Sequence, residues 1–169
     1  MRLMLITLLL LSDTVLIAFS KGPFELAPSH PNCTVALKII HPVKIKEIGS
    51  AYLILDGVRL ISPPDGAYEL YLSRDKSSLA HLQPTGPAFI SVLDTYSLNS
   101  PGAKSSIRFE ITKRLKTLLE KATPVCYVTI SFKANRPANT HPADKQKHQA
   151  PNSGRLLVTS FRIVTSLRS

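Results

Sequence analysis

The sequence predicts an all-β fold, an antiparallel β-sandwich of about seven or eight short strands with one short α-helix. Three observations predict it: apolar and polar residues alternate in most segments, turn residues separate these segments, and only residues 113–122 have a helical period. Strands and helices do not alternate along the chain, which argues against a parallel α/β sheet. A small β-barrel is the alternative arrangement of the same strands.

The first twenty residues, MRLMLITLLLLSDTVLIAFS, have the layout of a secretory signal peptide. Arg2 precedes an apolar run over residues 3–11, and Ala18 and Ser20 supply a small-x-small cleavage pattern. We therefore expect cleavage after Ser20, a secreted, extracytoplasmic protein, and no transmembrane segment after cleavage. An uncleaved membrane anchor is the alternative, but polar residues 12–14 interrupt the roughly 20 apolar residues that a span needs.

The rest of the chain is expected to form an extended lead-in over residues 21–33 and a single β-sandwich domain over residues 34–169. The lead-in is rich in proline. Val35, Leu37 and Ile39 alternate in the first strand, and the weaker pattern of residues 43–48, VKIKEI, predicts an edge strand.

Residues 51–73, AYLILDGVRLISPPDGAYELYLS, predict two strands joined by a Pro/Gly turn. The first strand is apolar on both sides, which indicates a central strand, and Asp56 and Gly57 predict a bulge or a hairpin within it. A further strand is expected at residues 89–93.

The second half of the domain contains the helix. Residues 106–112, SIRFEIT, alternate as a strand, and the leucine spacing of residues 113–122 predicts an amphipathic helix that Thr112 caps. Strands are expected again at residues 125–132 and 155–164, separated by a polar, flexible insertion at residues 134–154.

Two modifications are expected of a secreted chain. Cys33 and Cys126 are candidates for a disulfide, with two buried free thiols as the alternative. Asn32 begins the sequon Asn32-Cys33-Thr34 and is a candidate N-glycosylation site.

The net charge of +10 is concentrated in the C-terminal part of the chain, where residues 104–169 carry thirteen Lys and Arg against three acids. Such asymmetry favours an anionic partner or simply a solvated basic face. Nucleic acid is not expected, because no aromatic-plus-basic motif is present. The candidate anion-binding face consists of Lys113, Lys116, Lys121, Lys133, Arg136, Lys145 and Lys147.

No catalytic or metal-binding constellation is visible, so the sequence predicts a protein that is not an enzyme and has no cofactor. A metal site would require histidines at converging spacing, and no two of the five lie three or four residues apart. No G-x-S-x-G motif and no glycine-rich phosphate loop occur. The histidines are His30, His41, His81, His141 and His148.

The order of elements over residues 34–169 resembles the C-terminal domain of plant-type polyphenol oxidases and related tyrosinase-like type-3 copper proteins. The resemblance rests on apolar spacing in successive strands and in the helix. The matching positions are Leu53, Ile54, Leu55, Gly57, Val58, Tyr68, Tyr71, Phe89, Ile90, Val92, Phe109, Ile111, Leu115, Leu118, Val128, Ile130, Phe161 and Ile163.

In that family, this domain packs over the catalytic domain and shields its copper site in the latent form. The resemblance therefore implies a β-sandwich and a shielding role, with residues 81–89 as the region to search for the shielding contact. The helical copper domain and its histidine ligands are absent from this sequence, so no catalytic residue is carried over.

Four functions follow from these observations. The first is a secreted, non-catalytic module that covers or binds a partner, with a separate type-3 copper oxidase domain as the expected partner. The second is a basic module that binds an anionic polysaccharide or a membrane surface. The third is an inactive remnant of a copper oxidase, and the fourth is an independent enzyme or metal carrier.

Overall fold

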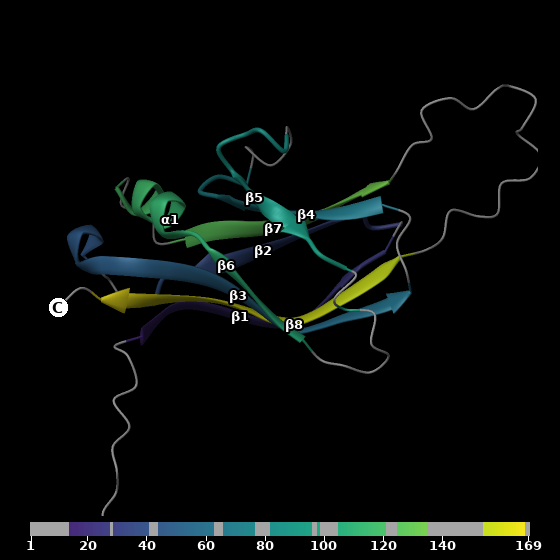
Figure 1. The fold of residues 1–169 in the computed structure, drawn as a ribbon, viewed down its shortest axis with the longest axis horizontal. Helices are drawn as coiled ribbons and strands as arrows, with labels where there is room; N and C mark the ends of the chain where they lie inside the picture. The colour runs from purple at the N-terminus through teal and green to yellow at the C-terminus, as the bar shows by residue number, and fades with distance from the viewer. Residues whose placement is uncertain are drawn as a thin grey trace, which may run out of the picture.

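Two four-stranded antiparallel sheets face each other in the computed structural model of the chain (Figure 1). The structure describes residues 14–27, 29–40, 44–62, 66–76, 82–95, 98, 105–120, 125–134 and 154–167. The elements are β1 (Thr14–Leu26), β2 (Asn32–Lys38), the 3₁₀ helix η1 (Ile45–Glu47), β3 (Ile48–Ser62), β4 (Gly66–Ser73), β5 (Phe89–Leu93), β6 (Ser105–Glu110), α1 (Thr112–Leu119), β7 (Val125–Ala134) and β8 (Arg155–Leu167).

One sheet has the strand order β1-β8-β3-β6 and is called the β8 sheet here; the other has the order β2-β7-β4-β5 and is called the β7 sheet. All of their strand pairs are antiparallel. The predicted sandwich is confirmed over the barrel alternative, because the described strands form two separate open sheets.

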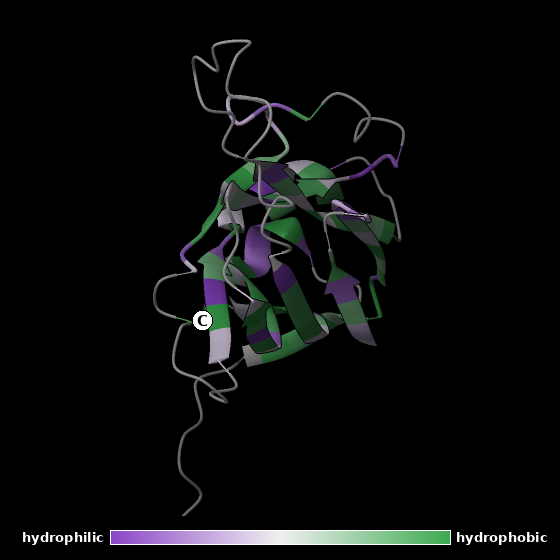
Figure 2. Ribbon diagram, turned by 90° about the vertical axis from the view of Figure 1, so that its right-hand side faces the viewer, coloured by the Kyte–Doolittle hydropathy of each residue, from purple (hydrophilic) through white to green (hydrophobic). Residues whose placement is uncertain are grey.

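The core lies between the sheets and is built from the inward side chains that the alternating patterns predict. Along β4, for example, Tyr68, Leu70 and Leu72 enter the core. Phe24 and Phe161 of neighbouring strands meet edge to face, with 5.1 Å between ring centroids. Figure 2 shows the resulting change between hydrophilic and hydrophobic residues along the strands.

The sandwich begins earlier than predicted. Thr14–Leu26 forms the edge strand β1, paired with β8 from Thr14↔Ser166 to Leu26↔Leu156, so the described part of the sandwich includes residues well before residue 34. The predicted lead-in at residues 21–33 is therefore wrong, since it supplies the end of β1 and the start of β2. Ile17 and Ala18 are fully buried. Cleavage after Ser20 stays a prediction, and it would remove the first half of this strand.

Four smaller predictions also change or fall outside the structure. Residues 45–47 form the short η1 instead of an edge strand. The helix spans Thr112–Leu119, and Thr112 is its first residue instead of its cap. Gly57 has a positive φ of 60° at a register shift between β3 and β6, which confirms the bulge. Residues 135–153 of the predicted flexible insertion lie outside the described residues.

The described helices are short, and none of them is a segment that could span a bilayer.

Candidate functional site

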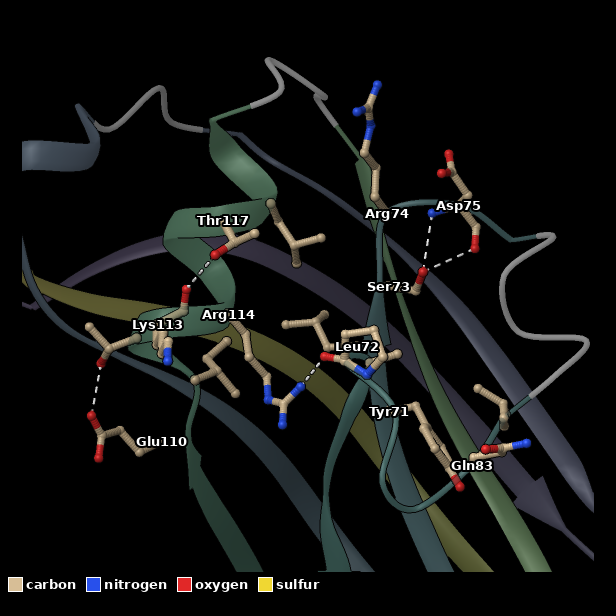
Figure 3. Close-up of a pocket in the computed structure, with 17 residues that line it drawn as sticks. Tyr71, Leu72, Ser73, Arg74, Asp75, Gln83, Glu110, Lys113, Arg114 and Thr117 are labelled. Atoms are coloured by element: carbon tan, nitrogen blue, oxygen red, sulfur yellow. Dashed lines mark hydrogen bonds between the residues drawn. The ribbon is translucent and has the colours of Figure 1, made fainter.

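A cleft of about 800 Å³ lies between helix α1 and the segment that joins β4 to β5 (Figure 3). Its walls come from the first turns of α1, from residues 82–88 and from the turn after β4. A volume of this size falls in the range of small-molecule sites, roughly 300–1,000 Å³. The cleft is the candidate site.

The sequence positions the helical wall by fixing the start of α1 to β3. The Ile111 N–H donates to the Ala51 carbonyl and the Ala51 N–H donates to Thr112 Oγ1, both over 2.8 Å. Thr112 Oγ1 in turn donates to Glu110 Oε1 over 3.1 Å. Leu115 points into the core and is fully buried. The polar face of α1 is thereby turned to the cleft.

Backbone bonds and one arginine fix the opposite wall. The Leu72 N–H donates to the Ala88 carbonyl over 2.8 Å, and the Gly86 N–H donates to the Gln83 carbonyl over 2.9 Å. Arg114 reaches across from α1 and donates from Nη1 to the Pro87 carbonyl (Figure 3). The two walls are therefore joined by a side chain of the helix.

Cationic groups outnumber carboxylates in the cleft. Arg74, Lys113 and Arg114 contribute to its lining, and Asp75 and Glu110 are the acids beside them. Arg74 Nε is buried and has no hydrogen-bond partner among the described residues. Figure 3 shows the Arg74 side chain directed away from Lys113 and Arg114.

A buried phenol that lines this cleft is hydrogen-bonded to a buried carboxylate of the same strand. Tyr71 lines the cleft, is fully buried, and donates from its hydroxyl to Glu69 Oε2 over 2.5 Å. Its ring meets Phe89 edge to face, with 5.6 Å between centroids. Burial, and then the bond to Glu69, raise the pKa of Tyr71 well above its ordinary value. The phenol therefore stays protonated and acts as a fixed donor.

The predicted disulfide is not formed, and both cysteines are free thiols. Cys33 lies opposite Ile130 and Cys126 lies opposite Leu37 in the β2–β7 ladder, so the two are four positions apart. That separation is about 13 Å along the strand, whereas disulfide-bonded Cα atoms lie roughly 4.4–6.8 Å apart. Burial raises the pKa of the Cys126 thiol to about 12 and also raises that of Cys33.

The predicted glycosylation site lies at the start of the edge strand β2. Asn32 is exposed there. Thr34 of the same sequon shares a hydrogen bond of 2.8 Å with Thr129. Attachment of a glycan to Asn32 stays a prediction.

The predicted basic face is divided by the fold. Lys113 and Lys116 lie on α1, whereas Lys133 is at the far end of β7 (Figure 1). Ser73 of the cleft pairs with Tyr127, and Lys133 is six residues further along β7, about 20 Å away. Lys121, Arg136, Lys145 and Lys147 lie outside the described residues.

Among the described residues, no group of three or more His, Cys, Asp or Glu side chains is placed to hold a metal ion. His30 is exposed and its Nδ1 lies 3.0 Å from the Ser29 hydroxyl. His41, His81, His141 and His148 are not in the described part of the chain.

Sequence reasoning did not find the cleft, because its two walls, residues 110–118 and residues 71–88, come from separate parts of the chain. The one available signal was the run Lys113-Arg114 on the polar face of a helix next to a buried strand. Glu69 and Tyr71 share one side of an alternating strand, but that pattern alone predicts solvent exposure instead of burial.

The fold is similar to that of polyphenol oxidase. Recombinant latent aurone synthase, described as a polyphenol oxidase, superposes with a TM-score of 0.54 at 13% identity, over 89% of this chain and 27% of that chain. Crystals of the same enzyme with hexatungstotellurate(VI) give 0.53 at 13% identity, over 86% of this chain and 26% of that chain. The enzyme from its natural source gives 0.50 at 13% identity, over 82% and 25%.

The chain thus spans about a quarter of the length of these structures. Neither the protein-family models nor the curated proteins include a match to the sequence. The comparison therefore shows a likeness in fold between this chain and a part of polyphenol oxidase.

Proposed function

We propose that the chain is a secreted, non-catalytic module that keeps residues 14–20 as part of β1 and covers the active site of a type-3 copper oxidase domain carried on a separate chain. The observation that carries the proposal is the match to about a quarter of a latent polyphenol oxidase. A module with the fold of one part of a latent enzyme is suited to cover a catalytic domain of that kind.

Exposed apolar side chains beside β1 supply a contact surface for such a partner. Leu16 and Phe19 on β1 have 38% and 44% of their surface exposed. Ile40, 48% exposed, lies beside them, because its N–H donates to the Ile17 carbonyl over 2.8 Å. Exposed hydrophobic groups that gather at one place mark protein interfaces. The partner is expected to cover these three residues.

The test adds the purified chain to a copper-loaded polyphenol oxidase catalytic domain that lacks its own C-terminal domain. We expect saturable inhibition of catechol oxidation and co-elution of the two proteins in size-exclusion chromatography. The chain alone, supplied with copper, is expected to oxidise no catechol. Absence of both inhibition and co-elution would overturn the proposal and favour an inactive remnant.

Two aspartate variants locate the contact. Phe19→Asp places a charge in the β1 surface and is expected to weaken inhibition at least roughly tenfold, the loss typical of an interface anchor. Val92→Asp is the matched control, since Val92 is 46% exposed on β5 in the other sheet. Equal effects of the two variants would contradict the assignment of the β1 surface.

A further inference from the structure

Beyond the covering role, we propose that two copies of the chain form a symmetric dimer in which β6 of one copy pairs antiparallel with β6 of the other. In this dimer Arg108 of each copy lies opposite Glu110 of the second copy. Strand β6 ends the β8 sheet at the edge opposite to β1. The dimer therefore leaves the β1 surface free for a different partner.

The outer edge of β6 presents backbone groups that no described strand pairs. Within the described residues, β6 pairs only with β3. The Ile111 N–H donates to the Ala51 carbonyl in the same register. Alternate residues of an antiparallel strand direct their N–H and C=O groups to opposite sides. The backbone groups of Arg108 and Glu110 therefore point away from β3, and such an edge is a template for another strand.

A second copy of β6 matches this edge. When Arg108 lies opposite Glu110 of the second copy, the two residues exchange both of their N–H···O=C bonds, and no backbone group of either is left unpaired. The two-fold axis then passes beside Phe109, which packs against the core but is only partly buried. Its ring would meet the same ring of the second copy and lose exposed surface.

Charge selects this register. Arg108 and Glu110 are both exposed on β6. A register that places either residue opposite itself brings like charges together, whereas the proposed register pairs opposite charges on both sides of the axis. Strands β2 and β5 also end a sheet, but Lys38 is the one charged residue that they contain. Neither of them is self-complementary in charge.

Both charged side chains can reach a second copy. Arg108 stacks over Tyr52, with Cζ 3.4 Å from the ring centroid, and forms no ion pair with a described residue. Because Arg108 is exposed, its side chain can turn from the ring to the edge without breaking an ion pair. Glu110 accepts the Thr112 hydroxyl at Oε1, which leaves Oε2 for a guanidinium of the second copy.

The experiment is sedimentation velocity of the full chain at increasing protein concentration, where we expect a reversible monomer–dimer equilibrium. Arg108→Glu and Glu110→Arg each place like charges opposite one another on both sides of the axis. Each is expected to weaken dimerisation at least roughly tenfold. Lys21→Glu makes the same change of charge on β1, at the other edge of the sheet, and should leave dimerisation unchanged. A chain that stays monomeric, or an equal loss in Lys21→Glu, would overturn the proposal.

Combining the two edge variants tests the pairing of the charges. An equimolar mixture of Arg108→Glu and Glu110→Arg should dimerise, because an acidic β6 then meets a basic one. The double variant, with both substitutions in one chain, should dimerise as the unchanged chain does. Circular dichroism checks that each variant is folded. If neither the mixture nor the double variant dimerises, the pairing of Arg108 with Glu110 is wrong. The assay contains no oxidase, so its outcome is separate from that of the covering role.

Discussion

On the outer face of the β8 sheet several polar side chains pair at the surface, whereas at the centre of the outer face of the β7 sheet, on β4 and β7, several polar side chains are buried. Asp56 and Arg162 form an ion pair at 2.6 Å, and Arg108 stacks over Tyr52 at 3.4 Å from the ring centroid. On the β7 sheet, Glu69, Tyr71, Thr129 and Ser131 are all buried.

The same alternating pattern thus has two physical meanings. Hydrogen bonds made at a wet surface add little net stability, whereas a buried polar group that loses its partner costs roughly 1–3 kcal/mol. We therefore expect the β7 sheet to depend on its polar pairs, and the β8 sheet to depend on strand pairing and on backbone geometry. The changes below test this difference, starting with the largest expected effect.

Deletion of residues 1–20 removes half of β1 and is expected to abolish cooperative folding. Removing a side chain as deeply buried as that of Ile17 costs about 2–5 kcal/mol. The deletion also removes the pairing of residues 14–20 with β8. The whole domain is stabilised by only roughly 5–15 kcal/mol. Thermal unfolding followed by circular dichroism measures the effect.

A chain that starts at Thr14 is the control and keeps all of β1. If the chain that starts at Lys21 unfolds cooperatively at the same temperature as this control, the first half of β1 is dispensable. The β8 sheet would then not depend on that strand pairing.

Gly57→Ala tests the bulge in β3. Alanine would adopt a φ near 60°, and its Cβ would lie 2.2 Å from Thr159 Oγ1 and 2.8 Å from Thr159 Cβ. We expect a loss of at least about 1–3 kcal/mol in the free energy of unfolding, measured with urea. Combination with Thr159→Gly relieves the contact, so the double variant should lose less than the sum of the single losses. Strict additivity would show that the contact with Thr159 does not matter.

Glu69→Ala leaves the Tyr71 hydroxyl without its acceptor on the buried face of the β7 sheet. We expect a loss of about 1–3 kcal/mol, and a similar loss for Tyr71→Phe, with a double variant that costs less than the sum. Urea unfolding of the unchanged chain, the two single variants and the double variant measures the energetic coupling between Glu69 and Tyr71.

Ser106→Ala provides the comparison on the exposed face, because Ser106 donates to Asp56 Oδ1 over 2.8 Å in an exposed hydrogen bond. Its expected loss is below about 0.5 kcal/mol. A loss in Ser106→Ala as large as in Glu69→Ala would remove the distinction between the two faces.

Local patterns predicted the strands and the helix, because side-chain period and backbone conformation are linked residue by residue. Leu53, Leu55 and Leu115 are fully buried where the alternating and helical patterns place them. Strand β1 was missed because an apolar stretch next to an N-terminus has the composition of an export signal as well as that of a strand. Lys21, Gly22 and Pro23 interrupt its alternation further.

Contacts between segments distant in sequence could not be predicted. The register that separates Cys33 from Cys126 is set by the pairing of β2 with β7, and no local pattern specifies it. The burial of Glu69 and Tyr71, and the approach of Arg114 to Pro87, also depend on how distant segments pack.

Asp56→Asn removes the charge of an ion pair on the exposed face and is expected to have a small effect. Hydrogen bonding from Arg162 lowers the pKa of Asp56 below its ordinary value of 3.8. The side chains of Arg162 and Asp56 are 40% and 28% exposed, so solvent screens the pair, and its contribution at pH 7 is about 0.2–1 kcal/mol. Because the folded-state pKa is the lower one, this stability is present above the ordinary pKa and is lost as the pH falls through the lowered value.

Urea unfolding of the unchanged chain and of Asp56→Asn, from pH 7 downward, measures this contribution. The two proteins should differ in free energy of unfolding at pH 7, and the difference should disappear in acid. A difference that stays constant across this range would show that Asp56 stabilises the sheet through its shape and hydrogen bonds, and that its charge has no part in it.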